Sequence, residues 1–370
     1  MADNKDKKVL NVPALRFPEF SREWKRHKLS EICSFYSGGT PSSSKKEFYN
    51  GNIPFIRSGE LHKDKTELFI TEDGLNSSAA KLVEIGDLLL ALYGATSGDI
   101  AISKIKGAIN QAILCIRTKQ NKKFIESVWN KHVERLLQTY LQGGQGNLSA
   151  DIVKNIPFYF ADLEEQDKLA NFISLLDERI STQNKIIEKL ETLIKGIIET
   201  VISSQKPNTL IKSCLSCNSS TLQESQVAET GTFPVYGATG ISGYTEAPDV
   251  NGESILIIKD GSGVGTVKHE TGEYSYIGTL NSLTAKDGYC LKFIYFALQK
   301  FCFESYKTGM AIPHIYFKDY GKAKIYCPPY KLQITISQQL TYIENKIDIE
   351  KHLLFYLLQQ KHYLLSQMFI

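Results

Sequence analysis

The sequence predicts an α+β protein in which two mixed α/β domains alternate with two long antiparallel coiled-coil helices, related by a pseudo-two-fold internal repeat. Three observations carry this prediction. An apolar seam with coiled-coil spacing runs through residues 165–203. The same seam recurs 167 residues later, in register. Each seam follows a long segment without heptad spacing, in which short apolar runs end at glycine-rich turns.

The seam positions step alternately by three and four residues. One polar residue interrupts each copy at the same step, Gln183 in the first and Glu350 in the second, and Lys361 is one further departure. The first seam is Leu169, Ile173, Leu176, Ile180, Gln183, Ile187, Leu190, Ile194, Ile197 and Val201. The second seam is Ile336, Leu340, Ile343, Ile347, Glu350, Leu354, Leu357, Lys361, Leu364 and Met368.

Two helices of about 39 residues, each about 58 Å long, can hide both apolar stripes by packing against each other. An antiparallel pair places Gln183 opposite Glu350 on the pseudo-dyad, where a polar layer fixes the register at some cost in stability. The alternative is that each helix packs separately on the surface of its own domain.

The length of 370 residues and a hydrophobic content of 42% suffice for two cores. We divide the chain into a charged tail (1–11), a first domain (12–160), a first spacer helix (161–204), a second domain (205–330) and a second spacer helix (331–370). The formal net charge of +3 permits a polyanionic partner without requiring one.

The cysteines indicate a reducing compartment. Seven are scattered through the chain, an odd number that does not form a disulfide framework, and the first eight residues are charged rather than apolar. No apolar run approaches the roughly 20 residues that cross a bilayer. We therefore expect a cytoplasmic protein that makes no membrane contact.

Three loops of the first domain combine glycine with small hydroxyl or amide side chains, at residues 37–44, 93–98 and 142–148. Such loops bring backbone amides close to a ligand and offer short side chains to phosphates or base edges, although glycine turns also join strands without binding anything. Residues 110–112 add amides that suit adenine or cap a turn. The candidate contacts of this domain are Gly38, Gly39, Thr40, Lys45, Lys46, Arg57, Tyr93, Thr96, Asn110, Gln111, Gln145 and Asn147.

The second domain repeats the pattern more loosely. Residues 231–240 correspond to 51–57, and the apolar run 254–265 corresponds to 88–98, each a strand delivered into a glycine loop. Residues 308–315 stand at the place of 144–148. The candidate contacts of this domain are Tyr236, Lys259, Ser262, Lys307, His314 and Lys318.

Three motifs look catalytic and are better explained otherwise. Cys327-Pro-Pro-Tyr330 resembles an adenine methyltransferase signature, but cysteine is a poor substitute for its first residue, and prolines at a helix entrance explain it. Gly261, Gly263 and Gly265 lack the lysine and hydroxyl of a phosphate loop. The pair Cys214 and Cys217 has no second pair to complete a metal site. We predict no catalytic residue, no metal site and no cofactor in this chain.

The chain resembles the specificity subunits of Type I restriction-modification systems over nearly its whole length. The resemblance rests on the duplicated layout and on several short segments. These are residues 12–20 (Val-Pro-Ala-Leu-Arg-Phe-Pro-Glu-Phe), 38–42 (Gly-Gly-Thr-Pro-Ser), 53–57, 143–148, 156–157 followed by 163–166 (Leu-Glu-Glu-Gln), and 312–315 (Ile-Pro-His-Ile).

The resemblance implies two target recognition domains that contact the two halves of an asymmetric bipartite site on double-stranded DNA, without catalysis. It implies two modification subunits that methylate adenine N6, and restriction subunits; S-adenosylmethionine, ATP and Mg would belong to those partners. The second helix departs from the family pattern, because residues 329–333 read Pro-Tyr-Lys-Leu-Gln in place of a Leu-Glu-Glu-Gln start.

Two other classes remain open at this point. A self-contained methyltransferase or nuclease with a helical arm needs a donor pocket or a metal-binding carboxylate cluster. A coiled-coil scaffold that binds only proteins predicts no salt-sensitive affinity for DNA and leaves the glycine loops unexplained.

Overall fold

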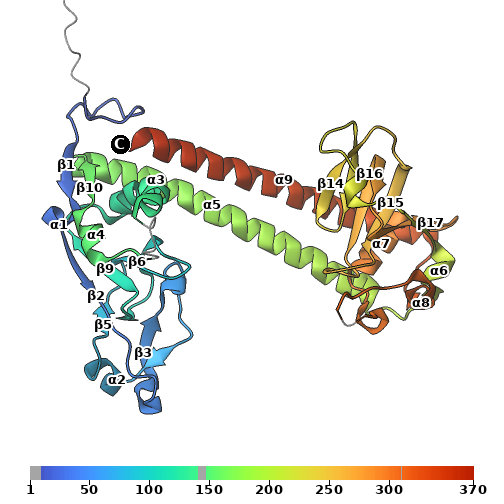
Figure 1. Cartoon of the computed structure of the whole chain (residues 1–370), viewed down its shortest axis with the longest axis horizontal. Coiled ribbons are helices and arrows are strands. Elements are labelled where there is room, and N and C mark those ends of the chain that lie inside the picture. Colours follow the sequence, from blue (N-terminus) through green and yellow to red (C-terminus); the bar gives the residue numbers. More distant parts are fainter. Residues whose placement is uncertain (1–9, 141–146, 310) are drawn as a thin grey trace, which may run out of the picture. The chain divides into compact units, whose positions relative to one another are not determined.

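The computed structural model describes residues 10–140, 147–309 and 311–370, and the chain divides into two compact units. Unit 1 comprises residues 1–183 with 353–370, and unit 2 comprises residues 184–352. Figure 1 shows the first domain in blue and green and the second in yellow and orange. Both units contain strands and helices, as the sequence predicts.

Unit 1 contains three small sheets. Their orders are β2-β9-β6-β7, β4-β3-β8-β5 and β1-β10. The strands are β1 (Lys25–Lys28), β2 (Cys33–Ser37), β3 (Tyr49–Ile56), β4 (Phe69–Ile70), β5 (Lys81–Val83), β6 (Leu88–Ala91), β7 (Ile100–Ile102), β8 (Gly107–Ile109), β9 (Ile113–Thr118) and β10 (Pro157–Phe160). The helices are α1 (Leu29–Ile32), α2 (Glu72–Asn76), α3 (Lys122–Tyr140) and α4 (Ala150–Asn155), with short 3-10 turns η1 (Lys46–Phe48) and η2 (Ser58–Glu60).

Unit 2 gathers most of its strands into one six-stranded sheet, in the order β12-β17-β15-β16-β13-β14. The strands are β11 (Thr209–Leu210), β12 (Leu215–Ser219), β13 (Phe233–Gly237), β14 (Gly240–Thr245), β15 (Val250–Ile258), β16 (Val267–Tyr276), β17 (Leu280–Ala285) and β18 (Lys324–Ile325). The helices are α6 (Ile211–Cys214), α7 (Leu291–Gln299) and α8 (Phe317–Tyr320), with 3-10 turns η4 (Glu224–Gln226) and η5 (Glu304–Tyr306).

The strand orders confirm the internal repeat. The run β2-β9-β6 of unit 1 matches β12-β17-β15 of unit 2. β3 pairs in parallel with β8, as β13 pairs in parallel with β16. The long strand β16 occupies the position that β7 and β8 occupy together in unit 1, where residues 103–106 separate those two strands. This break explains why unit 1 has two four-stranded sheets where unit 2 has one of six strands.

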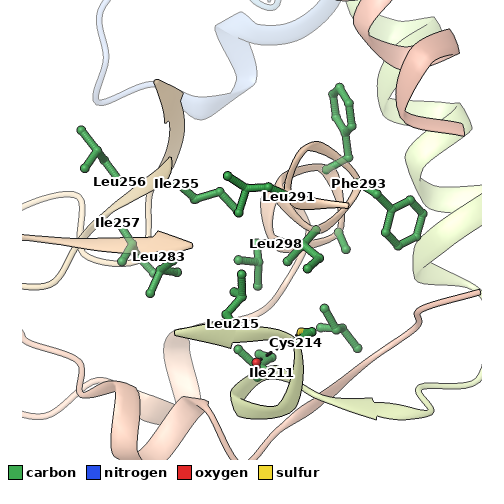
Figure 2. Packing of buried hydrophobic residues seen from close by; sticks show 14 of the residues in the cluster. Ile211, Cys214, Leu215, Ile255, Leu256, Ile257, Leu283, Leu291, Phe293 and Leu298 are labelled. Carbon is green, nitrogen blue, oxygen red and sulfur yellow. Dashed lines mark hydrogen bonds between the residues drawn. The ribbon is translucent and has the colours of Figure 1, made fainter. Parts of the chain in front are cut away.

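The core of unit 2 lies between this sheet and α7. Figure 2 shows Ile255 of β15, Leu291 of α7 and Leu215 of β12 directed into one cluster. All three are 3% exposed or less. β15 reads as an apolar run because its C-terminal half is buried on both faces. The strand therefore carries the loop that follows it on a rigid base.

The two predicted spacer helices are α5 (Leu163–Ile198), which ends in a π-helical turn at Glu199–Ser203, and α9 (Tyr330–Met368). In unit 1 the first half of α5 shares a core with the last part of α9, for example Leu169 and Ile173 with Leu364. In unit 2 the end of α5 shares a core with the start of α9, through Ile194 and Leu340. Within each unit the helices therefore run antiparallel, and the alternative of separate surface helices is wrong.

The polar seam residues are buried, as a polar layer requires. Gln183 is 6% exposed and Glu350 is 8% exposed, and the Lys346 ammonium lies 2.5 Å from the Glu350 carboxylate. That Gln183 faces Glu350 stays a prediction. None of the helices in the described ranges combines the length and apolar character that crossing a bilayer requires.

An N-terminal arm, the described residues 10–24, packs on the start of α5. The guanidinium of Arg16 donates two hydrogen bonds of 2.7 Å to the Glu165 carboxylate, and the Trp24 indole donates a third at 3.1 Å. The Phe17 ring packs edge-on against Phe172. Aromatic packing and a buried ion pair thus hold a segment whose prolines keep it out of a helix.

Candidate DNA interface

The same strand-to-glycine-loop connection occurs once in each unit. In unit 1, β6 runs into residues 93–98, and the Gly98 amide donates a 2.9 Å hydrogen bond to the Ala91 carbonyl. In unit 2, β15 runs into residues 260–265, and the Gly265 amide donates a 2.9 Å bond to the Ile258 carbonyl. Both loop-closing glycines have positive φ, 87° and 92°, which only glycine adopts without strain. Residues 167 positions apart thus close the same loop.

A second segment lies against each glycine loop. The Leu148 amide donates a 2.8 Å hydrogen bond to the Leu92 carbonyl, and the Ile315 amide donates a 2.9 Å bond to the Lys259 carbonyl. Asn147 and His314, each one residue earlier, therefore lie beside corresponding loops, as the repeat predicts. We call the residues 92–98 with 147–149, and 259–265 with 313–318, the loop surfaces of units 1 and 2.

The loop surface of unit 1 brings three predicted residues together. Tyr93 and Thr96 are half-buried within the loop, whereas Asn147 is exposed beside it. Burial raises the pKa of the Tyr93 phenol, so it remains a hydrogen-bond donor at neutral pH. Gln145, also predicted here, lies outside the described residues.

The loop at Gly38 meets the turn at Asn110 elsewhere in unit 1. Thr40 donates a 2.6 Å hydrogen bond to the Gln111 amide oxygen, and the exposed pair presents further polar atoms. Asn110 accepts a bond from the Ala112 amide, so its side chain caps the turn. A Cβ on Gly38 would lie 1.7 Å from the Ile109 carbonyl oxygen, and one on Gly39 would collide with Ala79. These two glycines permit close packing of backbone, which explains them without a ligand.

Three predicted cations of unit 1 differ in how free they are. The Arg57 guanidinium donates bonds of 3.2 and 2.9 Å to Glu60 and one of 3.3 Å to Glu67. Burial disfavours the charged Glu60, but its bonds from Arg57 and Thr66 outweigh this and lower its pKa to about 2. Arg57 is thus held by carboxylates, whereas Lys45 and Lys46 are exposed, with the Lys45 ammonium 4.9 Å from the centre of the Phe48 ring.

The loop surface of unit 2 carries a chain of aromatic and cationic side chains. His314 packs edge-on against Tyr316 at 5.0 Å, and the Lys318 ammonium lies 5.0 Å from the centre of the Tyr316 ring. Ser262 is exposed at the tip of the glycine loop, and Lys259 is half-buried where the loop leaves β15. Four predicted residues thus gather on one surface. Lys307, by contrast, forms a 2.5 Å ion pair with Glu304.

Tyr236 lines a cavity together with Thr266, the residue that follows the same glycine loop. This cavity of about 190 Å³ separates the β13–β14 turn from Thr266, with Leu256, Ile258 and Leu280 in its lining. The Lys268 ammonium lies 4.8 Å from the centre of the Tyr236 ring. Burial, followed by the charge of Glu270, raises the pKa of Tyr236 to about 12. The phenol therefore stays protonated and able to donate a hydrogen bond.

Sequence reasoning missed two basic residues beside the unit 1 loop, His62 and Lys104. His62 lies 2.8 Å from Asp99, the residue after the loop-closing glycine, and the Lys104 ammonium donates a bond to the His62 carbonyl. The bond to Asp99 outweighs burial and raises the pKa of His62. Tyr316 and Lys268 were also missed. Their partners are distant in sequence or lack a motif, so no sequence signal pointed to them.

The described residues contain no group of three or more histidine, cysteine or acidic side chains that could hold a metal ion. The Cys327-Pro-Pro-Tyr330 motif is a helix entrance, as predicted: Cys327 is buried, its amide donates to Asn208, and α9 begins at Tyr330. What the two loop surfaces offer is amide, hydroxyl, phenol and ammonium groups on rigid strands. Such groups bind phosphates and base edges.

A duplicated strand-and-glycine-loop domain carried on long antiparallel helices defines a class of protein with two recognition surfaces in one chain. The chain belongs to the family of Type I restriction modification DNA specificity domains, whose model matches residues 21–192 and 214–358. The resemblance inferred from the sequence is thereby confirmed.

Two curated relatives illustrate the match. The chain is 28% identical over 187 residues to the Type I restriction enzyme EcoR124I/EcoR124II specificity subunit of Escherichia coli, covering 48% of this chain and 45% of that protein. It is 24% identical over 210 residues to the Type I restriction enzyme MjaVIII specificity subunit of Methanocaldococcus jannaschii, covering 54% and 46%. The matches thus span about half the length of these relatives.

Two solved structures share the fold. The Type I restriction-modification system S subunit from M. genitalium matches with a TM-score of 0.68 and 18% identity, covering 97% of this chain and 99% of that one. A chain from a structure titled for complex assembly and conformational transition of the type I R-M system matches with a TM-score of 0.54 and 15% identity, covering 93% and 97%. The fold of this chain is therefore shared with the S subunit from M. genitalium.

Proposed function

We propose that this chain is the sequence-specific DNA-binding subunit of a Type I restriction-modification complex and that it is not itself an enzyme. Each unit reads one half of an asymmetric bipartite site on double-stranded DNA. One observation carries the proposal: the same loop surface is built twice on the same backbone bonds, but with different side chains.

The backbone of the two loop surfaces is equivalent, whereas the exposed groups are not. Asn147 occupies the place at which unit 2 has His314, and the unit 2 loop carries Lys259 where unit 1 has Leu92. Base edges are distinguished by the pattern of donors, acceptors and methyl groups that a protein presents to them. Equal scaffolds with unlike side chains therefore favour two unlike half-sites.

The partners and chemistry follow from the family. We propose that two modification subunits assemble on this chain and methylate adenine N6 within the site, and that restriction subunits join them to cleave DNA. S-adenosylmethionine, ATP and Mg are supplied to those subunits, and the complex acts in the cytoplasm. The similarity to specificity subunits of Type I restriction enzymes supports this assignment.

The decisive experiment maps N6-methyladenine across the genome of a host that carries a modification subunit, with and without this chain. We expect methylation at one bipartite motif only when both are present. A control replaces this chain by one truncated before residue 205, which removes the second domain together with α9 and should give no methylation of the bipartite motif. Methylation without this chain, or at a single continuous motif, would contradict the proposal.

A domain exchange then assigns each half-site. Chimeras joined with a family member of known target at residues 160–205 should methylate a hybrid site, with one half from each parent. The reciprocal chimera is the control and should give the complementary hybrid. If each chimera keeps one parent's whole site, the assignment of one half-site to each unit is wrong.

A further inference from the structure

Each spacer helix begins with a buried glutamine that binds the recognition domain of its own unit. Gln166 of α5 is completely buried. Its amide nitrogen donates bonds of 2.7 Å to the Ala161 carbonyl and to the Gln120 side chain, and its oxygen accepts a 3.1 Å bond from the Asn121 amide. Asn121 directly precedes α3, so Gln166 ties the start of the domain helix to the start of the spacer helix.

The second unit repeats this arrangement despite its different helix start. Gln333 of α9 is 2% exposed, donates a 2.8 Å bond to the Pro328 carbonyl and accepts a 2.9 Å bond from the Cys290 amide. Cys290 caps the start of α7. Residues 329–333 depart from the family's sequence, yet Gln333 makes the counterparts of two of the three Gln166 bonds, one to a carbonyl five residues earlier and one from the amide at the start of the domain helix. The different sequence at the start of α9 therefore leaves the contact between Gln333 and α7 intact.

A second contact lies 11 residues further along each spacer helix. The Lys123 ammonium of α3 lies 2.7 Å from Asp177 of α5, and the Lys292 ammonium of α7 lies 2.8 Å from Glu344 of α9. Eleven residues make about three helical turns, so both contacts lie on one face, about 16 Å apart. The side chains of Lys292 and Glu344 are 21% and 26% exposed, which shields the pair from bulk water.

We infer that the glutamine and the acid of each spacer helix form a two-point clamp, which sets the orientation of the recognition domain on its helix and so positions it for one spacing of the half-sites. Two bonds separated along a helix resist rotation that one bond permits. The clamped helix also reaches the loop surface: in unit 1 the Trp129 indole of α3 donates a 2.7 Å bond to the Gly98 carbonyl. In unit 2, α7 packs against β15 and β16.

This inference rests on the proposed function, because spacing has meaning only for a bipartite site. The clamp residues are positioning residues and need not touch DNA. Breaking the clamp in one unit should therefore relax the preference for spacing and leave the sequence of each half-site unchanged. Substitution of a residue that only stabilises the fold would change neither the preference for spacing nor the sequence of the half-sites.

The test uses the full chain assembled with its modification subunits and duplexes of the mapped site. These carry the native spacer, or one base pair more or fewer. The variants are Gln333→Leu and Glu344→Gln, and the control is Gln338→Leu on an exposed position of the same helix. We expect clamp variants to lose about tenfold of the preference for the native spacer, a difference of about 1.4 kcal/mol, whereas the control keeps it.

Two further measurements keep the inference open to refutation. If Gln333→Leu does not fold, Lys292→Gln breaks the partly exposed contact instead. The charge-exchanged double variant Lys292→Glu with Glu344→Lys should restore the spacer preference. Unchanged preference in variants that melt earlier would overturn the clamp and leave a purely structural role. If the unsubstituted complex itself shows no spacer preference, the bipartite proposal fails instead.

Discussion

The Lys361 ammonium lies 2.6 Å from the Asp177 carboxylate, which makes a seam position of α9 the partner of an acid on α5 within unit 1. Lys361 is the one cation in the second apolar seam, and this contact explains why the heptad pattern fails there. Asp177 also binds Lys123 of α3. One carboxylate therefore joins both spacer helices to the first recognition domain.

Loss of the Asp177 charge should destabilise unit 1 in a pH-dependent way. Burial opposes ionisation of Asp177, but the bonds from Lys123 and Lys361 outweigh it and hold its pKa below the usual range. A carboxyl group with a depressed pKa in the folded state stabilises the protein above its unfolded pKa, near 4, and loses that contribution as the pH falls. We expect Asp177→Asn to cost about 2 kcal/mol at pH 7 and much less at a pH well below about 4, where the carboxyl group is protonated in the folded state as well. Denaturant unfolding at both pH values tests this; an equal cost at both would contradict it.

Arg16 should matter far more than its neighbour Arg22. Arg16→Met leaves the Glu165 carboxylate, 3% exposed, without its cation and should cost about 3 kcal/mol. The pair of Arg22 with Asp162 is exposed, so Arg22→Met should cost less than about 1 kcal/mol. Limited proteolysis should cut residues 10–24 faster in the first variant only. Similar cleavage of both variants would show that the buried pair does not hold the arm.

Gly38 should not tolerate a methyl group. Gly38→Ala places a Cβ 1.7 Å from the Ile109 carbonyl oxygen, a backbone atom that cannot move without disturbing β8. Gly59→Ala is the matched control, because nothing lies within 4 Å of its Cβ position. We expect loss of folded protein, or a large drop in melting temperature, for Gly38→Ala alone. A folded Gly38→Ala that still fails to bind DNA would instead indicate a direct role in recognition.

Lys46 and Lys318 are predicted phosphate contacts and should affect the salt dependence of binding. Each phosphate contact contributes about 0.9 to the slope of log affinity against log salt. Lys46→Gln and Lys318→Gln should each reduce the slope by about that amount and weaken binding to all sequences alike. Lys189→Gln, on an exposed position of α5, is the control. DNA-binding titrations with mapped and scrambled duplexes at several salt concentrations measure the slope. An unchanged slope would show that the substituted lysine does not contact a phosphate.

Lengthening the spacer helices should change the length of the DNA spacer alone. One inserted heptad in each of α5 and α9 keeps the seam in register and adds about 10 Å, the length of about three base pairs. Methylation mapping should then find both half-sites unchanged at a wider separation. A two-residue insertion is the control, because it turns the following apolar residues by about 200° away from the seam and should abolish methylation. A change in half-site sequence would count against the helices as a ruler.

The heptad seam could be predicted because the pattern is local. Buried positions such as Leu169 and Leu340 follow from a spacing of three and four residues, whatever lies across the interface. The strand-then-glycine-loop units could be predicted for the same reason. Which side chains meet could not, because the partners of His62 and Asp177 come from other elements. Arg57 shows the opposite failure: it reads as a free cation, yet carboxylates three and ten residues away hold it.

Three features could be read from the sequence alone, because each depends on periodic or contiguous residues: the duplication, the two spacer helices and the family. The fold in three dimensions established that Gln166 and Gln333 accept equivalent bonds, because the donors, the amides of Asn121 and Cys290, lie more than forty residues away. It also decided that Asn147 and His314 flank equivalent loops. Hydrogen bonds to backbone groups of distant segments create these relationships. Because every residue carries the same backbone groups, the sequence does not indicate which of them will be bonded.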